Sequence, residues 1–204
     1  MSDLRLAALA ALVLVGTAFL VGVRIAFERP TGRHRYRASR VSGAILAAEA
    51  IAVAAAPVPP GRGAAALALL ALALALFGWA AWTNRARKLG LAFAGAVPAH
   101  VQTGGPHGLV RHPFYASYLL AFVGGAVAAG TPWLVPALAA GAFTYWRAAR
   151  DEEEAFERSP LADAYRRYSG RVGMFLPRSP WPRSGSKAGE VAPASSCGRE
   201  GSAG

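Results

Sequence analysis

Cysteine is almost absent from this chain, which has one, Cys197, among 204 residues. A single cysteine excludes an internal disulfide framework and any metal site built from paired cysteines. His34 and His100 show no metal-ligand spacing with it, so we predict no metal. Alternating strand patterns and internal repeats are also missing, which argues against a β-sheet and a repeat architecture. The fold class that remains is all-α.

Long apolar runs dominate what is there, and apolar residues make up 54% of the chain. A run of about 20 apolar residues is long enough to cross about 30 Å of hydrocarbon. We therefore predict a polytopic membrane protein of about five transmembrane helices. The predicted spans are about 4–27, 41–58, 64–82, 114–130 and 133–149. Glu49 interrupts the second span, where we expect it to face the helix bundle, with a proton or substrate role as the alternative.

The distribution of positive charge predicts the orientation of these spans. The chain has 22 lysines and arginines against 11 acidic residues. With five spans, all the lysines and arginines except Arg5 and Arg62 fall on one side of the membrane. By the positive-inside rule that side is cytoplasmic. We expect an inner or plasma membrane protein with its N-terminus outside and its C-terminus in the cytoplasm. The same topology explains the net positive charge without nucleic-acid binding, which we do not predict.

The cytoplasmic side is expected to carry a small helical cap, formed by residues 83–113 and 147–177. The fifth helix should continue through an acidic run that ends at Glu157. Ser159 and Pro160 are predicted to begin the next helix as N-cap and first helical residue, and Gly170 to end it. Residues 172–177 should fold back towards the membrane. Residues 1–177 thus form one domain, and the Ser/Gly/Pro/Ala-rich tail 178–204 is predicted to be disordered.

An ordered set of polar residues lies in this cap. Gly105-Pro106 precedes Arg111-His112-Pro113-x-Tyr115, and Glu153-Glu154 and then Tyr165-x-x-Tyr168 follow. No single piece is specific, but the ordered set resembles the isoprenylcysteine carboxyl methyltransferase family, to which phospholipid methyltransferases are related. The resemblance covers roughly residues 82–177. The domain 1–177 is accordingly expected to be a single membrane methyltransferase domain.

The resemblance implies an integral membrane enzyme that binds S-adenosylmethionine in a cytoplasm-facing pocket. Its acceptor would be a lipophilic or prenylated molecule that enters from the bilayer. The residues that the resemblance assigns to catalysis are Arg111 and Glu153. Those that it assigns to cofactor binding are Gly105, Pro106, His107, Val110, His112, Pro113, Tyr115, Glu153, Glu154 and Tyr165. His107 departs from the pattern, because the family usually has tyrosine there.

The residue types suit this cofactor independently of the resemblance. S-adenosylmethionine carries a sulfonium, an amino-acid group and two ribose hydroxyls, so its site needs both carboxylates and donors for a carboxylate. Glu153 and Glu154 supply the first, while Arg111 and His112 supply the second. We expect Arg111 to orient a carboxylate, with a simple role as an interfacial anchor as the alternative. For the acidic run the alternative is a solvated helix face.

Several functions stay open at this point. Carboxyl O-methylation of an isoprenylcysteine-like acceptor is the first choice and phospholipid N-methylation the second. A carboxylate is already ionised at neutral pH, whereas an amine must first lose a proton. A steroid-reductase-like enzyme using NADPH would have a glutamate a few residues after His-Pro-x-Tyr, where this chain has Ala116-Ser117-Tyr118. A non-enzymatic membrane scaffold would explain the helices but not the polar set.

Overall fold

The computed structural model describes residues 3–26, 35–85 and 100–178, and these residues form helices without a strand. Within these ranges the α-helices are α1 (Asp3–Ala26), α2 (Arg35–Ala55), α3 (Pro60–Asn84), α4 (Pro113–Ala129), α5 (Val135–Glu157) and α6 (Ala162–Ser169). Two short 3₁₀ helices, η2 (Gly105–Gly108) and η3 (Pro132–Leu134), precede α4 and α5. The all-α fold class is confirmed. The predicted disordered tail lies, apart from Arg178, outside the described residues.

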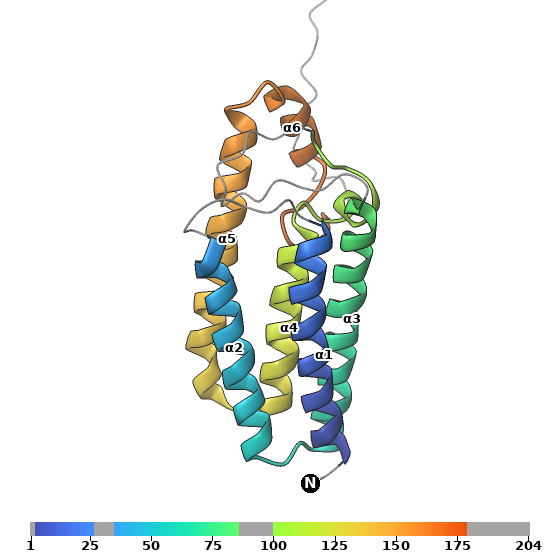
Figure 1. Ribbon diagram of the computed structural model, residues 1–204. Helices are drawn as coiled ribbons and strands as arrows, with labels where there is room; N and C mark the ends of the chain where they lie inside the picture. Colours follow the sequence, from blue (N-terminus) through green and yellow to red (C-terminus); the bar gives the residue numbers. More distant parts are fainter. Residues whose placement is uncertain (1–2, 27–34, 86–99, 179–204) are drawn as a thin grey trace, which may run out of the picture.

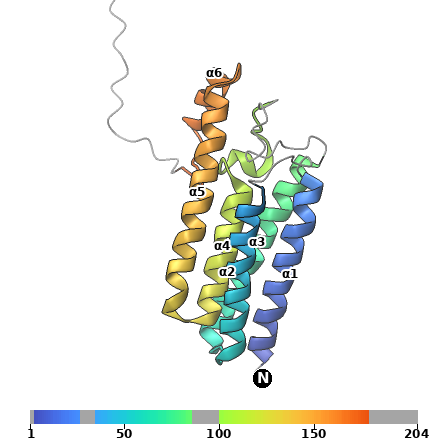
Figure 2. The ribbon, with the colours of Figure 1, turned by 60° about the vertical axis from the view of Figure 1, so that its left-hand side comes forward.

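Helices α1 to α5 run side by side as one bundle, and α6 lies beyond the end of the bundle opposite the N-terminus (Figure 1). Turned by 60°, the molecule shows the same arrangement, with α5 rising past its neighbours to reach α6 (Figure 2). Helix α4 packs most extensively against α3 and also contacts α1, α2 and α5. The polar residues of the cap therefore gather at one end of an apolar bundle.

Small residues let these helices approach closely, as is common where helices pack in lipid. On α3 the buried stripe has helical spacing and consists of Gly63, Ala66, Leu70, Ala73, Phe77, Ala80 and Asn84. An aromatic cluster fills the core near the cap, where Phe77 meets Phe19 at 4.7 Å and Phe114 at 5.4 Å between ring centroids. The stripe ends in a polar residue, Asn84, which is fully buried beside the η2 loop.

Two of the described helices are long and apolar enough to cross a membrane by length and composition, α1 over Asp3–Gly22 and α3 over its full length. Helix α4 is apolar but shorter. Both α1 and α3 are candidate membrane spans. The count of five spans stays a prediction.

Helix α2 begins at Arg35, before the predicted membrane span 41–58, because arginine and alanine favour helix and a helix need not end at the membrane edge. One predicted helix start is wrong. Helix α6 begins at Ala162 rather than Pro160. The Ser159 hydroxyl instead donates to the Phe156 carbonyl at 2.8 Å and accepts from the Leu161 amide at 3.1 Å, so it stabilises the turn between α5 and α6. The predicted end of α6 at Gly170 and the turn at Gly130 are confirmed.

Candidate active site

The loop that leads into α4 lies against the end of α3. Gly105 has a φ of 59°, a conformation that L side chains rarely adopt. A Cβ at this position would also lie 2.5 Å from Thr83 Oγ1. Both the backbone conformation and the lack of space therefore require glycine here. Pro106, the next residue, is fully buried. The Gly-Pro pair thus fixes the path of the chain towards Arg111.

Gly173 and Met174 pair with the last residues before α4. The Arg111 amide donates to the Gly173 carbonyl at 2.8 Å, and the His112 amide donates to the Met174 carbonyl at 3.1 Å. Val110 and Gly173 form a parallel β-bridge. A Cβ on Gly173 would lie 2.0 Å from the Leu176 carbonyl oxygen, so glycine allows the tight turn that follows. The predicted fold-back of 172–177 therefore holds the backbone of Arg111 and His112.

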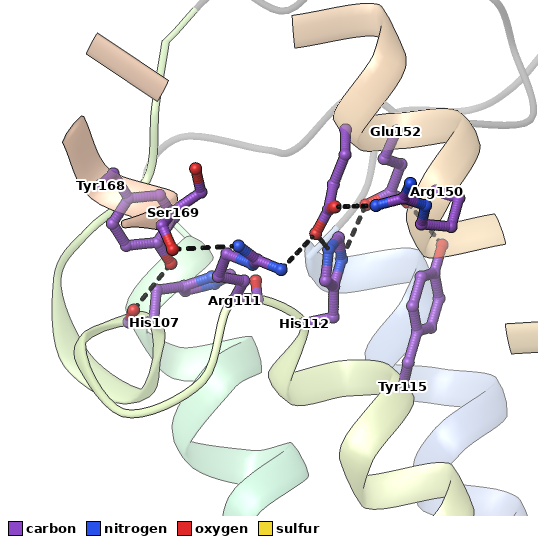
Figure 3. A network of polar contacts seen from close by, with 9 residues as sticks. His107, Arg111, His112, Tyr115, Arg150, Glu152, Tyr168 and Ser169 are labelled. Carbon is purple, nitrogen blue, oxygen red and sulfur yellow. Dashed lines mark hydrogen bonds and ion pairs between the residues drawn. The ribbon is translucent and has the colours of Figure 1, made fainter. Parts of the chain in front are cut away.

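His112 lies between two carboxylates from α5 (Figure 3). Its Nδ1 is 3.2 Å from Glu152 Oε2, and its Nε2 is 3.2 Å from Glu153 Oε1. Arg111 Nη2 lies 3.0 Å from the same Glu153 oxygen. The Tyr115 hydroxyl donates to Glu152 Oε1 at 2.5 Å. Two helices and the loop before α4 thus meet in one ionic cluster.

The charges of this cluster stabilise one another. Burial opposes the charged form of His112, but hydrogen bonds to Glu152 and Glu153 outweigh it and raise the pKa of His112 above its usual value. Because both ring nitrogens face carboxylate oxygens, each must carry a proton. Burial would raise the pKa of Glu153, but the His112 hydrogen bond and the Arg111 charge lower it overall. The cluster is therefore an imidazolium and a guanidinium facing two carboxylates.

Two buried polar atoms at the cluster make no hydrogen bond of good geometry among the described residues: Arg111 Nε and the Tyr165 hydroxyl oxygen. The other two nitrogens of Arg111 are engaged, Nη2 with Glu153 and Nη1 with the Ser169 carbonyl at 3.1 Å. The Tyr165 hydroxyl faces Glu153 closely enough that burial and then the charge of this carboxylate raise the pKa of Tyr165. Buried polar groups normally find a full partner, so Arg111 Nε in particular is left with unused hydrogen-bonding capacity.

The structure brings most of the predicted site residues together, with one exchange. Arg111, His112, Tyr115 and Glu153 meet in the cluster, while Gly105, Pro106, Val110 and Pro113 shape the loop and Tyr165 borders it. Glu154 points elsewhere, since it is exposed and pairs with Arg158 at 2.9 Å. Glu152, rather than Glu154, is the second carboxylate that faces His112. The expected Glu153–Glu154 pair is thus not the pair that faces His112.

His107, which was expected to bind the cofactor, makes its polar contacts within the protein. It is buried, with 6% of its surface exposed. Its Nε2 lies 3.1 Å from Asn84 Nδ2, and its Nδ1 lies 3.3 Å from the Arg111 carbonyl oxygen. Both ring nitrogens are occupied within the protein, so this side chain has no free polar atom to offer a cofactor.

The residues missed from the sequence are Glu152, Arg150, Asn84 and Ser169. A helical signal was available for the first, because Tyr145 and Ala149 are buried on α5 and lie seven and three residues before Glu152. The same period places Glu154 on another face of the helix. Arg150 Nη1 adds a longer contact of 3.5 Å to Glu153 Oε2. Ser169 acts through its backbone carbonyl, for which a sequence carries no signal.

Comparison with known proteins supports the resemblance carried by these motifs. A family model described as phospholipid methyltransferase matches residues 62–163, which is half of the chain. The match runs from the start of α3 to the start of α6 and contains Arg111, His112, Glu152 and Glu153. No curated protein and no solved structure matches the chain. The chain belongs to the phospholipid methyltransferase family, the family of isoprenylcysteine carboxyl methyltransferase-like enzymes.

Proposed function

We propose that this protein is an integral membrane methyltransferase that uses S-adenosylmethionine to methylate a lipophilic acceptor. The observation that carries the proposal is the ionic cluster of Arg111, His112, Glu152 and Glu153, which lies within the matched part of the chain. Family membership supports the reaction class, and the cluster offers groups of the kinds that the cofactor needs.

The residues present fit S-adenosylmethionine. The cofactor combines a carboxylate with an ammonium group and ribose hydroxyls, so it needs donors and acceptors side by side. The unpartnered Arg111 Nε can donate to its carboxylate, and the Tyr165 hydroxyl can donate or accept. Glu152 and Glu153 offer acceptors for the ammonium or the hydroxyls. When bound, the cofactor supplies a methyl group activated by attachment to a positively charged sulfur.

The protein's own contribution would be positioning. Methyl transfer is an in-line displacement, and holding the two reacting atoms at near-attack distance accounts for a large part of the rate in such reactions. The buried ion pairs hold Arg111 and His112 in place, because Glu153 contacts both. The short Tyr115–Glu152 hydrogen bond fixes the second carboxylate. A rigid set of charges can orient the amino-acid part of the cofactor before the acceptor arrives.

We propose that α1 to α5 all span the membrane, with the cap in the cytoplasm. All five helices expose large apolar side chains, as a lipid-facing surface requires. These include Leu14 on α1, Ile51 on α2, Leu72 on α3, Val123 on α4 and Phe143 on α5. Exposed tryptophans lie near both ends of the bundle, with Trp133 at one end and Trp82 at the other, which is typical of membrane interfaces. The arginine asymmetry of the sequence supports the orientation.

A carboxylate is the acceptor that the cluster favours. Amine methylation needs a base to remove a proton, and the lowered pKa of Glu153 makes that carboxylate a weak base. A carboxylate acceptor needs no such step. The alternative is N-methylation of an amine-bearing phospholipid. The description of the matching family favours this alternative. The acceptor would reach the site sideways from the bilayer in either case.

Ligand binding and product analysis test this proposal together. The purified protein in detergent would be titrated with S-adenosylmethionine and, separately, with NADPH, by calorimetry. We expect binding of the first only. Incubation with labelled S-adenosylmethionine and either a farnesylated cysteine or phosphatidylethanolamine would then identify the acceptor. Binding of NADPH alone would contradict the proposal in favour of a reductase, and binding of neither would favour a scaffold.

A further inference from the structure

A second polar network lies beside the ionic cluster and joins it to the end of α3. Its members are Asn84, Gln102 and His107, and none of them carries a charge at neutral pH. Asn84 is fully buried at the end of the α3 stripe. Gln102 and His107 flank the Gly-Pro turn. The proposed methyl-transfer chemistry does not use these residues.

The hydrogen bonds of Asn84 leave one consistent assignment of donors and acceptors. Its Nδ2 lies 2.8 Å from the Ala80 carbonyl oxygen and 3.1 Å from His107 Nε2. Its Oδ1 accepts from Gln102 Nε2 at 3.2 Å. A flipped amide would set Oδ1 against the Ala80 carbonyl and Nδ2 against the Gln102 amide donor, so it is excluded. Asn84 therefore donates to His107 Nε2.

This assignment fixes the tautomer of His107. Since Nε2 accepts, the proton of the neutral ring lies on Nδ1, which donates to the Arg111 carbonyl at 3.3 Å. Burial lowers the pKa of His107 to about 4, although the hydrogen bond to Arg111 opposes the shift; the positive charge of His112 lowers it further. The ring is therefore neutral at physiological pH. The opposite tautomer would point two lone pairs at each other across the Arg111 contact.

His107 also connects the loop to the cap through its backbone. The Tyr168 hydroxyl on α6 donates to the His107 carbonyl at 2.7 Å. One residue thus contacts α3 through its ring, α6 through its carbonyl, and the backbone of Arg111 through Nδ1. Arg111 in turn contacts Glu153 and the Ser169 carbonyl. Among the described residues this is a continuous path from the membrane helix to the ionic cluster.

We propose that Asn84 and His107 are positioning residues of the site: Asn84 selects the His107 tautomer whose Nδ1–H holds the Arg111 carbonyl, which keeps the Arg111 and His112 side chains facing Glu153. The proposal rests on the proposed methyltransferase function for its effect on activity. The other His107 tautomer would fill the same volume, but its unprotonated Nδ1 would leave the Arg111 carbonyl without a donor.

The substitution Asn84→Asp tests the tautomer, because it removes the donor and keeps the shape. A carboxylate facing Nε2 draws the ring proton to that nitrogen. With the carboxylate ionised and the ring neutral, Nδ1 then carries no proton. The Nδ1–H···O contact with the Arg111 carbonyl returns only when the carboxylate and the His107 ring share one additional proton. The groups facing His107 are otherwise unchanged: His112 and Arg111 from its own loop and Tyr168 from α6. We expect the ratio of variant to wild-type kcat/KM to fall about tenfold per pH unit once that proton is lost.

Asn84→Leu is the matched control, since it removes the same hydrogen bonds without adding a titratable group. Its ratio to wild type should be independent of pH, because the Arg111 carbonyl still favours a proton on Nδ1 and no new group titrates. A ratio for Asn84→Asp that is equally constant between pH 5 and pH 9 would overturn the proposal. Gel filtration and thermal unfolding of both variants in detergent would establish that folded protein is compared.

The tautomer itself can be measured without any activity. In wild-type protein labelled with ¹⁵N-histidine, His107 should show a protonated Nδ1 and an unprotonated Nε2 at pH 7. A protonated Nε2 would overturn the positioning role even if the enzyme methylates. Conversely, the expected tautomer in a protein that transfers no methyl group would support the Asn84–His107–Arg111 arrangement while contradicting the proposed function.

Discussion

His112 Nε2 and Glu153 Oε1 lie 3.2 Å apart although 41 residues separate them along the chain. This contact joins the start of α4 to the part of α5 that extends beyond the bundle. Both side chains are at most 8% exposed, so water screens the interaction little. A buried ion pair contributes strongly only when its members have further hydrogen bonds, and Arg111 and Glu152 provide these.

Thermal stability should depend on pH through this pair. The raised pKa of His112 stabilises the fold fully below its usual pKa of 6.5, and this contribution is lost as pH rises through the raised value. The lowered pKa of Glu153 stabilises the fold above its usual 4.5, and this contribution is lost as pH falls through the lowered value. We expect the melting temperature in detergent to be highest between these limits.

Single substitutions separate the two limbs of that profile. His112→Gln should flatten the alkaline decline, and Glu153→Gln the acidic one, as measured by scanning fluorimetry over pH 2 to 9. Arg166→Gln is a control, because its ion pair with Asp163 is on the surface and should contribute about 0–1 kcal/mol. Equal slopes for wild type and His112→Gln above pH 6.5 would mean that the imidazolium does not stabilise the fold.

Glu152 and Glu154 offer a matched pair of substitutions that tests cofactor binding. Glu152 contacts His112 and Tyr115, whereas Glu154 is exposed and contacts Arg158. Losing a hydrogen bond to a charged group costs about 1.5–3 kcal/mol, which is roughly tenfold or more in affinity. We therefore expect Glu152→Gln to weaken S-adenosylmethionine binding by about that factor in calorimetry, and Glu154→Gln to leave it unchanged. The reverse result would restore the pairing expected from the motif.

The two glutamates also show which parts of the fold and the site the sequence predicts. Hydrophobic runs predicted the order and approximate extent of the bundle helices, because apolar length is a strong signal in membrane helices. The motif predicted that Arg111, His112 and Glu153 belong together. The motif alignment assigned Glu154 rather than Glu152 as the partner of Glu153, because an alignment without gaps ignores the helical period that orients each side chain.

Other contacts lie beyond what local sequence can predict. The Arg111 guanidinium contacts the Ser169 carbonyl, and the Tyr168 hydroxyl contacts the His107 carbonyl. Any residue supplies a carbonyl, so neither partner has a sequence signature. The start of α6 was missed for a related reason: Ser159 is a good N-cap residue, but its hydroxyl serves the turn after α5. Tertiary structure decides between such alternatives.

Close packing of α2 and α4 predicts a strong coupling between Glu49 and Gly125. Glu49 is fully buried, and its two oxygens have no partner among the described residues. A Cβ on Gly125 would lie 2.2 Å from Glu49 Oε2. Gly125→Ala should destabilise the protein by about 1–3 kcal/mol through overpacking. Adding Glu49→Ala should recover part of this loss, and Gly78→Ala, which meets nothing within 4 Å, should be nearly neutral.

A double-mutant cycle measures this coupling by thermal unfolding in detergent. We expect an interaction free energy of about 0.5–3 kcal/mol that favours the double variant over the sum of the single ones. Strict additivity would show that the carboxylate moves aside freely, and the close contact between the two helices would then carry no energetic weight.

Membrane orientation can be checked with reporter fusions. The arginine asymmetry predicts that a fusion after Arg178 is cytoplasmic and that one in the loop between Ala55 and Pro60 lies outside. Alkaline phosphatase should thus be active only in the second fusion, and green fluorescent protein only in the first. A phosphatase-active fusion after Arg178 would contradict both the five-span count and the cytoplasmic location of the cap.

Arg111→Lys distinguishes a site residue from a membrane anchor. The guanidinium reaches Glu153 with one nitrogen and the Ser169 carbonyl with another, while Nε remains available for a ligand. A lysine ammonium retains the charge but is a single point, so it cannot serve separate acceptors in this fork geometry. We expect kcat/KM to fall on the order of tenfold, which corresponds to about 1.4 kcal/mol.

Arg150→Lys provides the matched comparison, because Arg150 is half-exposed and reaches Glu153 only at 3.5 Å. That variant should retain nearly full activity, since a long, partly solvated contact contributes little. An anchor at the membrane edge would tolerate lysine at either position, because both side chains place a positive charge at the interface. Wild-type rates and cofactor affinity in both variants would therefore assign Arg111 to anchoring alone, and its proposed contact with the cofactor would have to be abandoned.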